Sequence, residues 1–170
     1  NKINFRIINS VHSPRASLVT YVYSILNILH NILPINENDI LFSINSLFEI
    51  HKQISSNNLT GSNPAINLAN WITGIPLIYY PHGLQSAAIR LKSSFQENSK
   101  THAIAEDIIE SCHNGIVAWT NHSIVQPILL KGVDDYIKTK ERFLIIEQFL
   151  KEKNIDFKII NSVEGNILTK

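Results

Sequence analysis

Apolar residues follow two patterns along the chain, and each pattern predicts one kind of element. Positions repeated at helical spacing predict helices, whereas short unbroken apolar runs between glycine and proline signals predict buried strands. The helical pattern predicts helices at 18–29, 38–55, 64–72, 84–95 and 138–151, and another that begins near residue 164. The apolar runs predict strands at 5–9, 75–80, 124–130 and 155–160. Helices and strands therefore alternate over most of the chain.

Local signals fix several of these boundaries and the alternation fixes the fold class. Pro34 stops the first helix, the pair Asn63 and Pro64 starts the third, and Gly74 ends it. Parallel strands need long crossovers that cover both faces of a sheet. We therefore predict an α/β fold, a three-layer α/β/α sandwich with a mainly parallel, doubly wound sheet of about five strands. A chain of 170 residues has the length of one domain, so we expect residues 1–170 to form a single one.

The charge of the chain is nearly balanced, which narrows the classes of partner. Fifteen basic and 14 acidic residues give a net charge of +1, so the composition does not indicate nucleic acid or an anionic membrane as a partner. No apolar run reaches the roughly 18 to 20 residues of a membrane span, and the N-terminal residues lack the pattern of a signal peptide. The single cysteine, Cys112, cannot form an internal disulfide. We expect a soluble, cytoplasmic protein that acts on a small molecule.

A polar stretch at 96–115 interrupts the apolar patterns and collects carboxylates, histidines, a lysine and the cysteine. In a doubly wound sheet, ligands bind beyond the carboxyl ends of the strands, so we expect this stretch to be a loop of a binding site. Glu97 shares helical spacing with Arg90 and Ser94, a pattern that is also typical of a solvated helix face. His113 precedes an apolar segment, and a hydrogen-bonded loop histidine explains it as well as a catalytic one.

Other chemistries find little support in the same residues. The spacing of His102, Cys112, His113 and His122 matches no common zinc pattern. Nothing in the sequence indicates that Cys112 is an activated nucleophile. The chain also lacks the G-x-G-x-x-G, Walker and G-x-S-x-G motifs of dinucleotide-binding proteins, P-loop proteins and serine hydrolases.

Several motifs, in their order along the chain, resemble one family, the bacterial and archaeal bifunctional phosphoglucose/phosphomannose isomerases. The similarity is to their second sugar-isomerase (SIS) domain, and it is carried by SPRAS, NPAINLANWI, GIPLIYYPHGLQSAAIRLKSSFQENSK and HNGIVAW. In that family a glutamate in an N-E-N-A-K-like segment precedes the histidine of H-N-E-I-V-G-W by sixteen residues. Glu97 precedes His113 by the same sixteen positions. The similarity covers nearly the whole chain.

The resemblance implies aldose–ketose isomerisation of hexose 6-phosphates through an enediolate. Glucose 6-phosphate and fructose 6-phosphate would be interconverted, and mannose 6-phosphate would be accepted too. It assigns the proton shuttle between C2 and C1 to Glu97, a role suited to a partly buried carboxylate, ring opening to His113, and stabilisation of the enediolate charge to Arg15. The residues implied in substrate binding are Asn98, Lys100 and Asn114. The resemblance implies no metal or cofactor, and it implies a homodimer in which His113 reaches the neighbouring subunit's site.

The sequence departs from the family pattern at several positions, and two other functions remain as alternatives to the isomerase. Gln96 and Ser99 replace the usual Asn and Ala beside the glutamate, and Gly115 replaces a common Glu. The first SIS domain of the family, which supplies most Ser and Thr contacts to the sugar phosphate, and a C-terminal tail with an active-site lysine are absent from these 170 residues. We therefore expect this chain alone to be inactive. The main alternative is a non-catalytic SIS module that binds a sugar phosphate and regulates a partner, and a metal-dependent hydrolase with a metal at His113 is a third.

Overall fold

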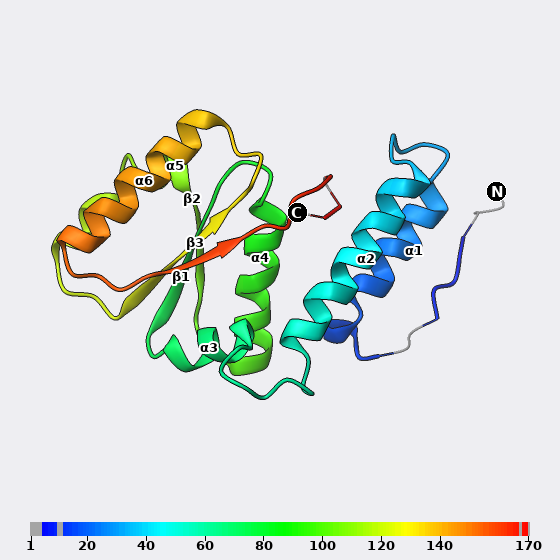
Figure 1. The fold of residues 1–170 in the computed structure, drawn as a ribbon, viewed down its shortest axis with the longest axis horizontal. Coiled ribbons are helices and arrows are strands. Elements are labelled where there is room, and N and C mark those ends of the chain that lie inside the picture. Colours follow the sequence, from blue (N-terminus) through cyan, green and yellow to red (C-terminus); the bar gives the residue numbers. More distant parts are fainter. Residues whose placement is uncertain (1–4, 10–11, 167, 170) are drawn as a thin grey trace. The chain divides into compact units, whose positions relative to one another are not determined.

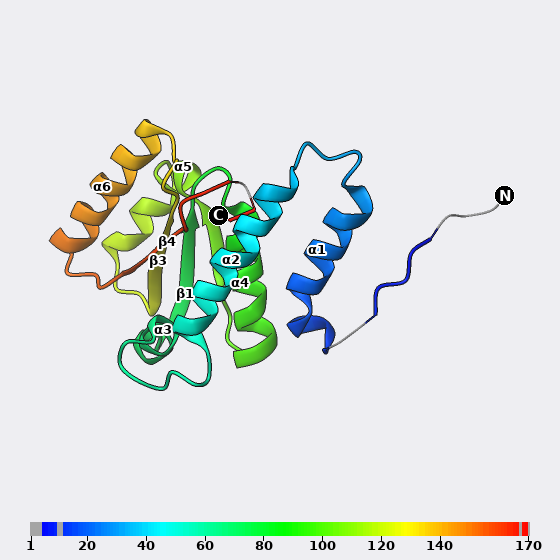
Figure 2. The ribbon, with the colours of Figure 1, turned by 45° about the vertical axis from the view of Figure 1, so that its right-hand side comes forward.

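The chain divides into two compact units, Asn1–Ile40 and Leu41–Lys170, and each is described by itself. The structure is a computed structural model that describes residues 5–9, 12–166 and 168–169. Figures 1 and 2 show its elements from two directions. Every strand of the described chain belongs to the second unit, which therefore carries the fold class.

The first unit is built around one apolar helix. A short 3₁₀ helix, η1 (Pro14–Ala16), leads into α1 (Leu18–Leu29), as the apolar spacing predicts. A second predicted helix, α2 (Glu37–Ile54), begins in this unit and continues in the next. The strand predicted at 5–9 is wrong, because these residues pair with no strand of the described chain. An apolar run forms a strand only where a neighbouring ladder satisfies its backbone groups.

A four-stranded parallel sheet forms the centre of the second unit. Its strands stand in the spatial order β2-β1-β3-β4 and have the bounds β1 (Ile75–Tyr80), β2 (Ile104–Asp107), β3 (Val125–Lys131) and β4 (Lys158–Asn161). In the register of the sheet, Tyr79 of β1 is level with Glu106 of β2 and Leu129 of β3. The predicted fold class is confirmed, with four strands in the described residues where about five were expected.

Helices cover both faces of this sheet and give three layers (Figures 1 and 2). One face packs against α3 (Pro64–Trp71) and α4 (Gln85–Ser94). The other packs against α5 (Ile108–Ser111), the 3₁₀ helix η3 (Gly115–Thr120) and α6 (Ile137–Glu152). The central strands β1 and β3 are therefore buried on both sides, which is why they appear in the sequence as unbroken apolar runs.

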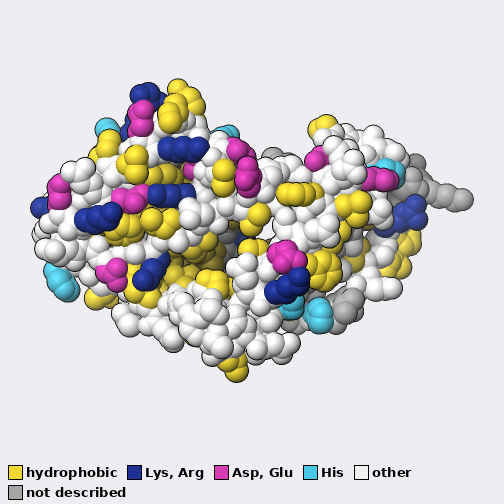
Figure 3. All heavy atoms as spheres, in the orientation of Figure 1, with side chains coloured by type: hydrophobic (Ala, Val, Ile, Leu, Met, Phe, Trp, Pro, Cys, Tyr) yellow, Lys and Arg dark blue, Asp and Glu magenta, His cyan; other side chains and the backbone are white. Residues whose placement is uncertain are grey.

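Helix α6 shows how burial and solvation divide a helix surface. Its buried positions are Thr139, Phe143, Ile146 and Leu150. On the exposed surface around it, side chains of both charges are interspersed with hydrophobic ones (Figure 3). Lys138 pairs with Glu141 at 2.8 Å, and a more buried pair joins Lys131 of β3 to Glu147. The helix thus presents its apolar stripe to the sheet and most of its charged side chains to solvent.

The start of β1 is a close crossing of two backbone segments. The main-chain N–H of Ile75 donates to the Ile124 carbonyl oxygen at 3.0 Å, and the side-chain oxygen of Gln126 accepts from the Gly74 N–H at 2.6 Å. A Cβ placed on Gly74 would lie only 1.9 Å from the Ile124 oxygen. Helix α3 already ends at Trp71, so Gly74 is needed for this close approach and not, as predicted, to end the helix.

Three other predictions in the second unit need correction. The strand predicted at 155–160 is shorter and begins at Lys158, as β4. The helix predicted near Glu164 is not formed in the described residues 164–166 and 168–169, which make bends and turns. The stretch 96–115, predicted to be a loop, contains a π-helical turn, β2 and α5. These short elements have too few residues to show a period in the sequence.

Candidate functional site

Glu97 lies on a π-helical turn that extends α4. The turn covers Phe95–Ser99 and follows directly after Ser94, the last residue of α4. Single π-helical turns are rare and occur frequently at functional sites. The side chain of Glu97 is exposed. The structure therefore gives Glu97 an unusual backbone setting, but in this chain it does not give the carboxylate the partial burial that suits a proton shuttle.

Lys100 closes this turn in the left-handed backbone conformation. Its φ of 57° is uncommon for a residue other than glycine. Its Nζ donates a hydrogen bond to the main-chain oxygen of Glu97 at 2.7 Å, and the Ser99 hydroxyl donates to the main-chain oxygen of Phe95 at 2.6 Å. Asn98 lies exposed on the same turn. Three residues predicted for the site, Glu97, Asn98 and Lys100, are thus held on one short turn.

His113 and Asn114 follow α5, beyond the carboxyl end of β2. Asp107 starts α5 by accepting hydrogen bonds from the N–H groups of Ile109 at 2.8 Å and Glu110 at 3.3 Å. The N–H of His113 donates to the main-chain oxygen of Glu110 at 2.9 Å, and the Asn114 side chain donates to Glu110 Oε1 at 3.0 Å. Both side chains are exposed, so the imidazole is presented at the surface.

The structure does not bring Glu97 and His113 together within one chain. Because β1 and β2 are parallel, α4 must return the chain to the starting end of the sheet, and Glu97 therefore precedes β2. His113 comes after β2 and α5. The last turns of α4 and helix α5 lie toward opposite ends of the sheet (Figures 1 and 2). A site that uses both side chains would draw them from two copies of the chain.

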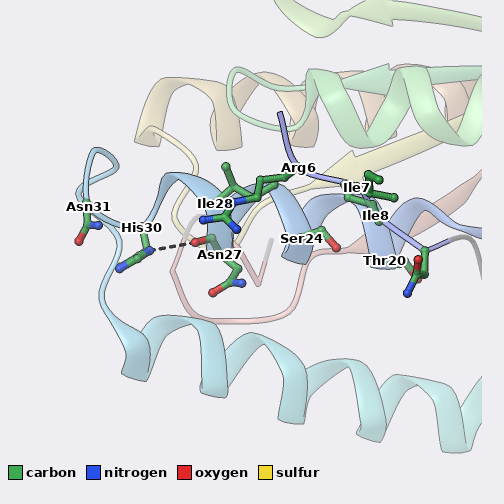
Figure 4. A pocket seen from close by; sticks show the side chains of 10 residues that line it. Arg6, Ile7, Ile8, Thr20, Ser24, Asn27, Ile28, His30 and Asn31 are labelled. Carbon is green, nitrogen blue, oxygen red and sulfur yellow. Dashed lines mark hydrogen bonds between the residues drawn. The ribbon is translucent and has the colours of Figure 1, made fainter. Parts of the chain in front are cut away.

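Arg15 belongs to the first unit, where it lies exposed in η1. An open pocket of about 610 Å³ is also found in this unit, between residues 6–9 and the face of α1 shown in Figure 4. Polar side chains of α1 line it, and His30 Nδ1 forms a hydrogen bond with the main-chain oxygen of Asn27 at 2.9 Å. None of the six residues predicted for the site lines this pocket.

A buried polar cluster beneath η3 was not predicted from the sequence. Trp119 Nε1 donates a hydrogen bond to the Tyr79 hydroxyl at 2.9 Å, and both side chains are buried. Burial raises the pKa of the Tyr79 phenol, the neighbouring Ser111 and Trp119 side chains oppose the rise, and Glu106 and Cys112 add to it. Tyr79 and Trp119 stand in apolar runs, which gave no sign of a polar role.

Glu106 of β2 is a second titratable group of this cluster. Burial raises the pKa of its carboxyl, and the nearby Glu110 carboxylate raises that pKa further. A Cβ placed on Gly115 would lie 3.0 Å from Glu106 Oε1 and 2.8 Å from Ser111 Oγ. The missing side chain at Gly115 therefore leaves room for these two groups. In the sequence, Gly115 stood out only as the replacement of a common glutamate of the family, and this replacement was not connected with a polar cluster.

The described residues give no support to two further possibilities, a metal site and a membrane-spanning helix. Within the described residues, no three or more His, Cys, Asp or Glu side chains are close enough together to hold a metal ion. His102, Cys112, His113 and His122 therefore do not form such a group. No helix in the described ranges has the length and apolar character needed to cross a bilayer.

Known proteins show which family shares this chain's fold. The family model for the bacterial phospho-glucose isomerase C-terminal SIS domain matches residues 61–170. A glucose-6-phosphate isomerase like protein from Thermus thermophilus is similar in structure, with a TM-score of 0.69 and 16% identity over 97% of this chain and 54% of that one. A protein from E. coli CFT073, solved as a complex with a ligand, has a TM-score of 0.50 and 15% identity over 79% and 70% of the two chains.

These similarities differ in what they establish. At 16% and 15% identity the two solved structures show the fold alone, and the chain spans about half the length of the Thermus protein. No curated protein matches the sequence. The family model covers the sheet and the segments that carry Glu97 and His113, and it accounts for well over half of the chain. The chain therefore belongs to the family of bacterial phospho-glucose isomerase C-terminal SIS domains.

Proposed function

We propose that this chain is the second SIS domain of an enzyme that interconverts aldose and ketose hexose 6-phosphates. Glucose 6-phosphate and fructose 6-phosphate are the primary pair, and mannose 6-phosphate is a further substrate. An upstream SIS domain binds the phosphate and a C-terminal tail completes the site. The family match over 61–170 supports this assignment, and so does the presence of Glu97 and His113 at the sixteen-residue spacing.

The chemistry needs one base, one ring-opening group and one cation. His113 transfers a proton between the ring oxygen and the O1 hydroxyl, which opens the pyranose, and an imidazole is suited to this exchange near neutral pH. Glu97 removes the proton from C2, which gives an enediolate with its charge on O1. The proton of the O2 hydroxyl passes to O1, and the carboxylic acid of Glu97 returns its proton to C1 as the C2 carbonyl forms. Arg15 stabilises the negative charge that develops on the enediolate oxygens. No net oxidation occurs.

The observation that carries the proposal is the π-helical turn at Phe95–Ser99. The turn and the left-handed Lys100 set Glu97 apart from the regular face of α4, which is the solvated face that its spacing with Arg90 and Ser94 suggested. Unusual backbone conformations of this kind cluster at active sites. The separation of Glu97 from His113 along β2 supports a site assembled from two subunits.

A non-catalytic SIS module is the second candidate, and the exposure of Glu97 favours it. An exposed carboxylate is a weak base for removing a carbon-bound proton. The two candidates separate when the complete two-domain protein is given glucose 6-phosphate and fructose 6-phosphate formation is followed. Turnover supports the isomerase, whereas saturable binding without turnover supports the regulatory module.

The chain of 170 residues alone is expected to turn over fructose 6-phosphate at least about 10²-fold more slowly than the complete enzyme. In the proposed enzyme the phosphate is bound by the other SIS domain, and remote binding of the phosphate positions the sugar for reaction. Parallel assays of the two proteins at equal concentration measure the difference. Comparable rates would mean that this chain holds the whole site.

The chain is expected to form a dimer through the surface beside His113. Val117 on η3 follows His113 closely and is 63% exposed, which leaves apolar area for an interface. Val117→Glu should shift the chain to a monomer in sedimentation experiments without unfolding it. Leu144→Glu on α6 is the matched control, because Leu144 is also 63% exposed and belongs to a different helix. A wild-type chain that stays monomeric at high concentration would contradict this interface.

A further inference from the structure

A cavity of about 290 Å³ lies between η3 and the sheet, and we name it the Glu106 cavity. Aliphatic side chains of β1, β2 and β3 form much of its wall, together with the aromatic side chains of Tyr79 and Trp119. Glu106 and Ser123 supply the polar side chains, and the backbone of Gly115 completes the lining. The cavity is thus a mainly apolar space with one carboxylate in its wall.

Two polar groups beside this cavity lack good partners in the described chain. The Glu106 carboxylate receives no hydrogen bond from the described residues, and no lysine or arginine lines the cavity there. Ser111 is 1% exposed, and its buried Oγ lies near the Tyr79 hydroxyl without forming a hydrogen bond of acceptable geometry. Both groups converge on the space beside Gly115. Of the two, the Ser111 Oγ is buried and the Glu106 carboxylate is half-buried, so both are available to pair with an occupant of the cavity.

We propose that the Glu106 cavity binds a small organic ammonium ion, with the Glu106 carboxylate pairing with the cationic group and the apolar wall holding its hydrocarbon body. This proposed binding is independent of the proposed isomerase chemistry, because Glu97, His113 and Arg15 do not line the cavity.

Charge and shape select this class of ligand over others. An anion would be repelled by Glu106 and by the nearby Glu110. A bare metal ion needs several oxygen, nitrogen or sulfur ligands, and the described residues form no such group. The volume is at the lower end of the range for ligand pockets, which limits the body to about one small ring. Aromatic walls also favour an ammonium group through cation–π attraction.

The titration of Glu106 agrees with such an occupant. Burial and Glu110 both raise the pKa of its carboxyl, so ionisation of Glu106 is less favourable than that of a fully solvated glutamate. A bound cation would favour the ionised form, since an opposite charge nearby stabilises the carboxylate. The absence of a side chain at Gly115 keeps the carboxylate accessible from the cavity, because a Cβ there would press against Oε1.

Benzylamine, which is an ammonium ion near neutral pH, is a suitable probe, and Trp119 is a built-in reporter. The chain has two tryptophans, so Trp71→Phe leaves Trp119 as the only one, with its ring in the cavity wall. Titration with benzylamine should change its emission saturably, with a Kd of about 1 mM. The neutral analogue benzyl alcohol should bind at least about tenfold more weakly, because it lacks the charged hydrogen bond. Calorimetry on the wild-type chain gives the same comparison if Trp71→Phe impairs folding.

Two substitutions separate a specific site from general attraction to acidic residues. Glu106→Gln keeps the shape of the side chain, removes its charge, and should abolish the preference for benzylamine over benzyl alcohol. Glu110→Gln is the matched control, because Glu110 lies close to Glu106 but does not line the cavity. It should change the affinity by less than about threefold. Equal affinity for the two probes, an unchanged preference in Glu106→Gln, or no saturable response at roughly tenfold higher concentration would overturn the proposal.

Discussion

Replacing Glu97 with glutamine in the complete enzyme is expected to lower kcat by about 10² to 10⁴-fold while leaving the binding of hexose 6-phosphates nearly unchanged. Glutamine keeps the size of the side chain and much of its hydrogen bonding, but it cannot accept the C2 proton. Steady-state turnover of fructose 6-phosphate and direct binding measurements give the two quantities separately.

Isotope exchange shows which step the Glu97 substitution removes. The proton held by Glu97 is the one that exchanges with solvent, so Glu97→Gln should stop the exchange of the C2 proton of glucose 6-phosphate in deuterium oxide. Glu141→Gln is a suitable control, because Glu141 is an exposed carboxylate on α6 that pairs with Lys138 and has no role in the proposed reaction. Near-normal turnover and exchange in Glu97→Gln would contradict the catalytic role of Glu97 and leave it as an ordinary solvated residue of a helix.

A substitution at His113 tests the ring-opening role proposed for its imidazole. His113→Ala should slow the reaction of closed pyranose substrate more than that of open-chain substrate, because ring opening is the only step assigned to the imidazole. Equal slowing of both reactions would contradict that assignment while leaving the role of Glu97 intact.

Replacing Gly74 with alanine is expected to destabilise the fold by about 3 kcal/mol or more. The added Cβ would meet the Ile124 carbonyl oxygen at 1.9 Å, and that oxygen is fixed because it accepts the N–H of Ile75 where β1 meets the start of β3. Neither backbone can move without breaking the pairing of the two central strands. Urea unfolding followed by circular dichroism measures the loss.

Gly61 provides the matched control for this prediction. No atom lies within 4 Å of a Cβ placed there, and Gly61 is exposed. Gly61→Ala is therefore expected to change the stability by no more than about 0.5 kcal/mol. A similar loss of stability in both variants would show that the backbone near Gly74 can move to accommodate the added Cβ.

The sequence predicted best the elements that are buried on two sides. The runs at 75–80 and 124–130 match β1 and β3 to within one residue, because a strand enclosed by two layers must be apolar throughout. Helices with a clear stripe, such as α6, were also placed within one residue at each end. Asn63 was recognised as the start of α3, and its side chain does accept the N–H groups of Ala65 and Ile66.

Edge strand β2 was not predicted, because an apolar residue of the strand is exposed and a charged residue is directed toward the core. Ile104 is 44% exposed although it lies on the same side of the strand as Glu106, which is half-buried toward the core. An inward carboxylate hides the apolar alternation by which short strands are recognised. Such charges are used on edge strands to discourage pairing with other sheets. Sequence pattern alone cannot distinguish that arrangement from a polar loop.

The sequence predicted which residues belong to the candidate site, but it did not predict how they are arranged in space. The sixteen-residue spacing identified Glu97 and His113, and the family match confirms the resemblance that this spacing carried. The π-helical turn depends on how the end of α4 meets the following segment, and helical periodicity does not reveal it. Glu97 precedes β2 and His113 follows it, and their separation depends on the parallel pairing of β1 with β2, which is a tertiary property.

The sheet order also determines how the nascent chain can fold on the ribosome. Strand β1 is made first of the four but occupies the centre, and Leu77 pairs with Ile104, 27 positions later (104 − 77), and with Pro127, 50 positions later (127 − 77). At a synthesis rate of about 5 to 20 residues per second, those 50 residues take roughly 3 to 10 s. During that time an apolar strand meant for burial on both faces is open to water and to other chains. Until β3 has left the exit tunnel, we therefore expect the emerging polypeptide to expose the kind of apolar surface that chaperones bind.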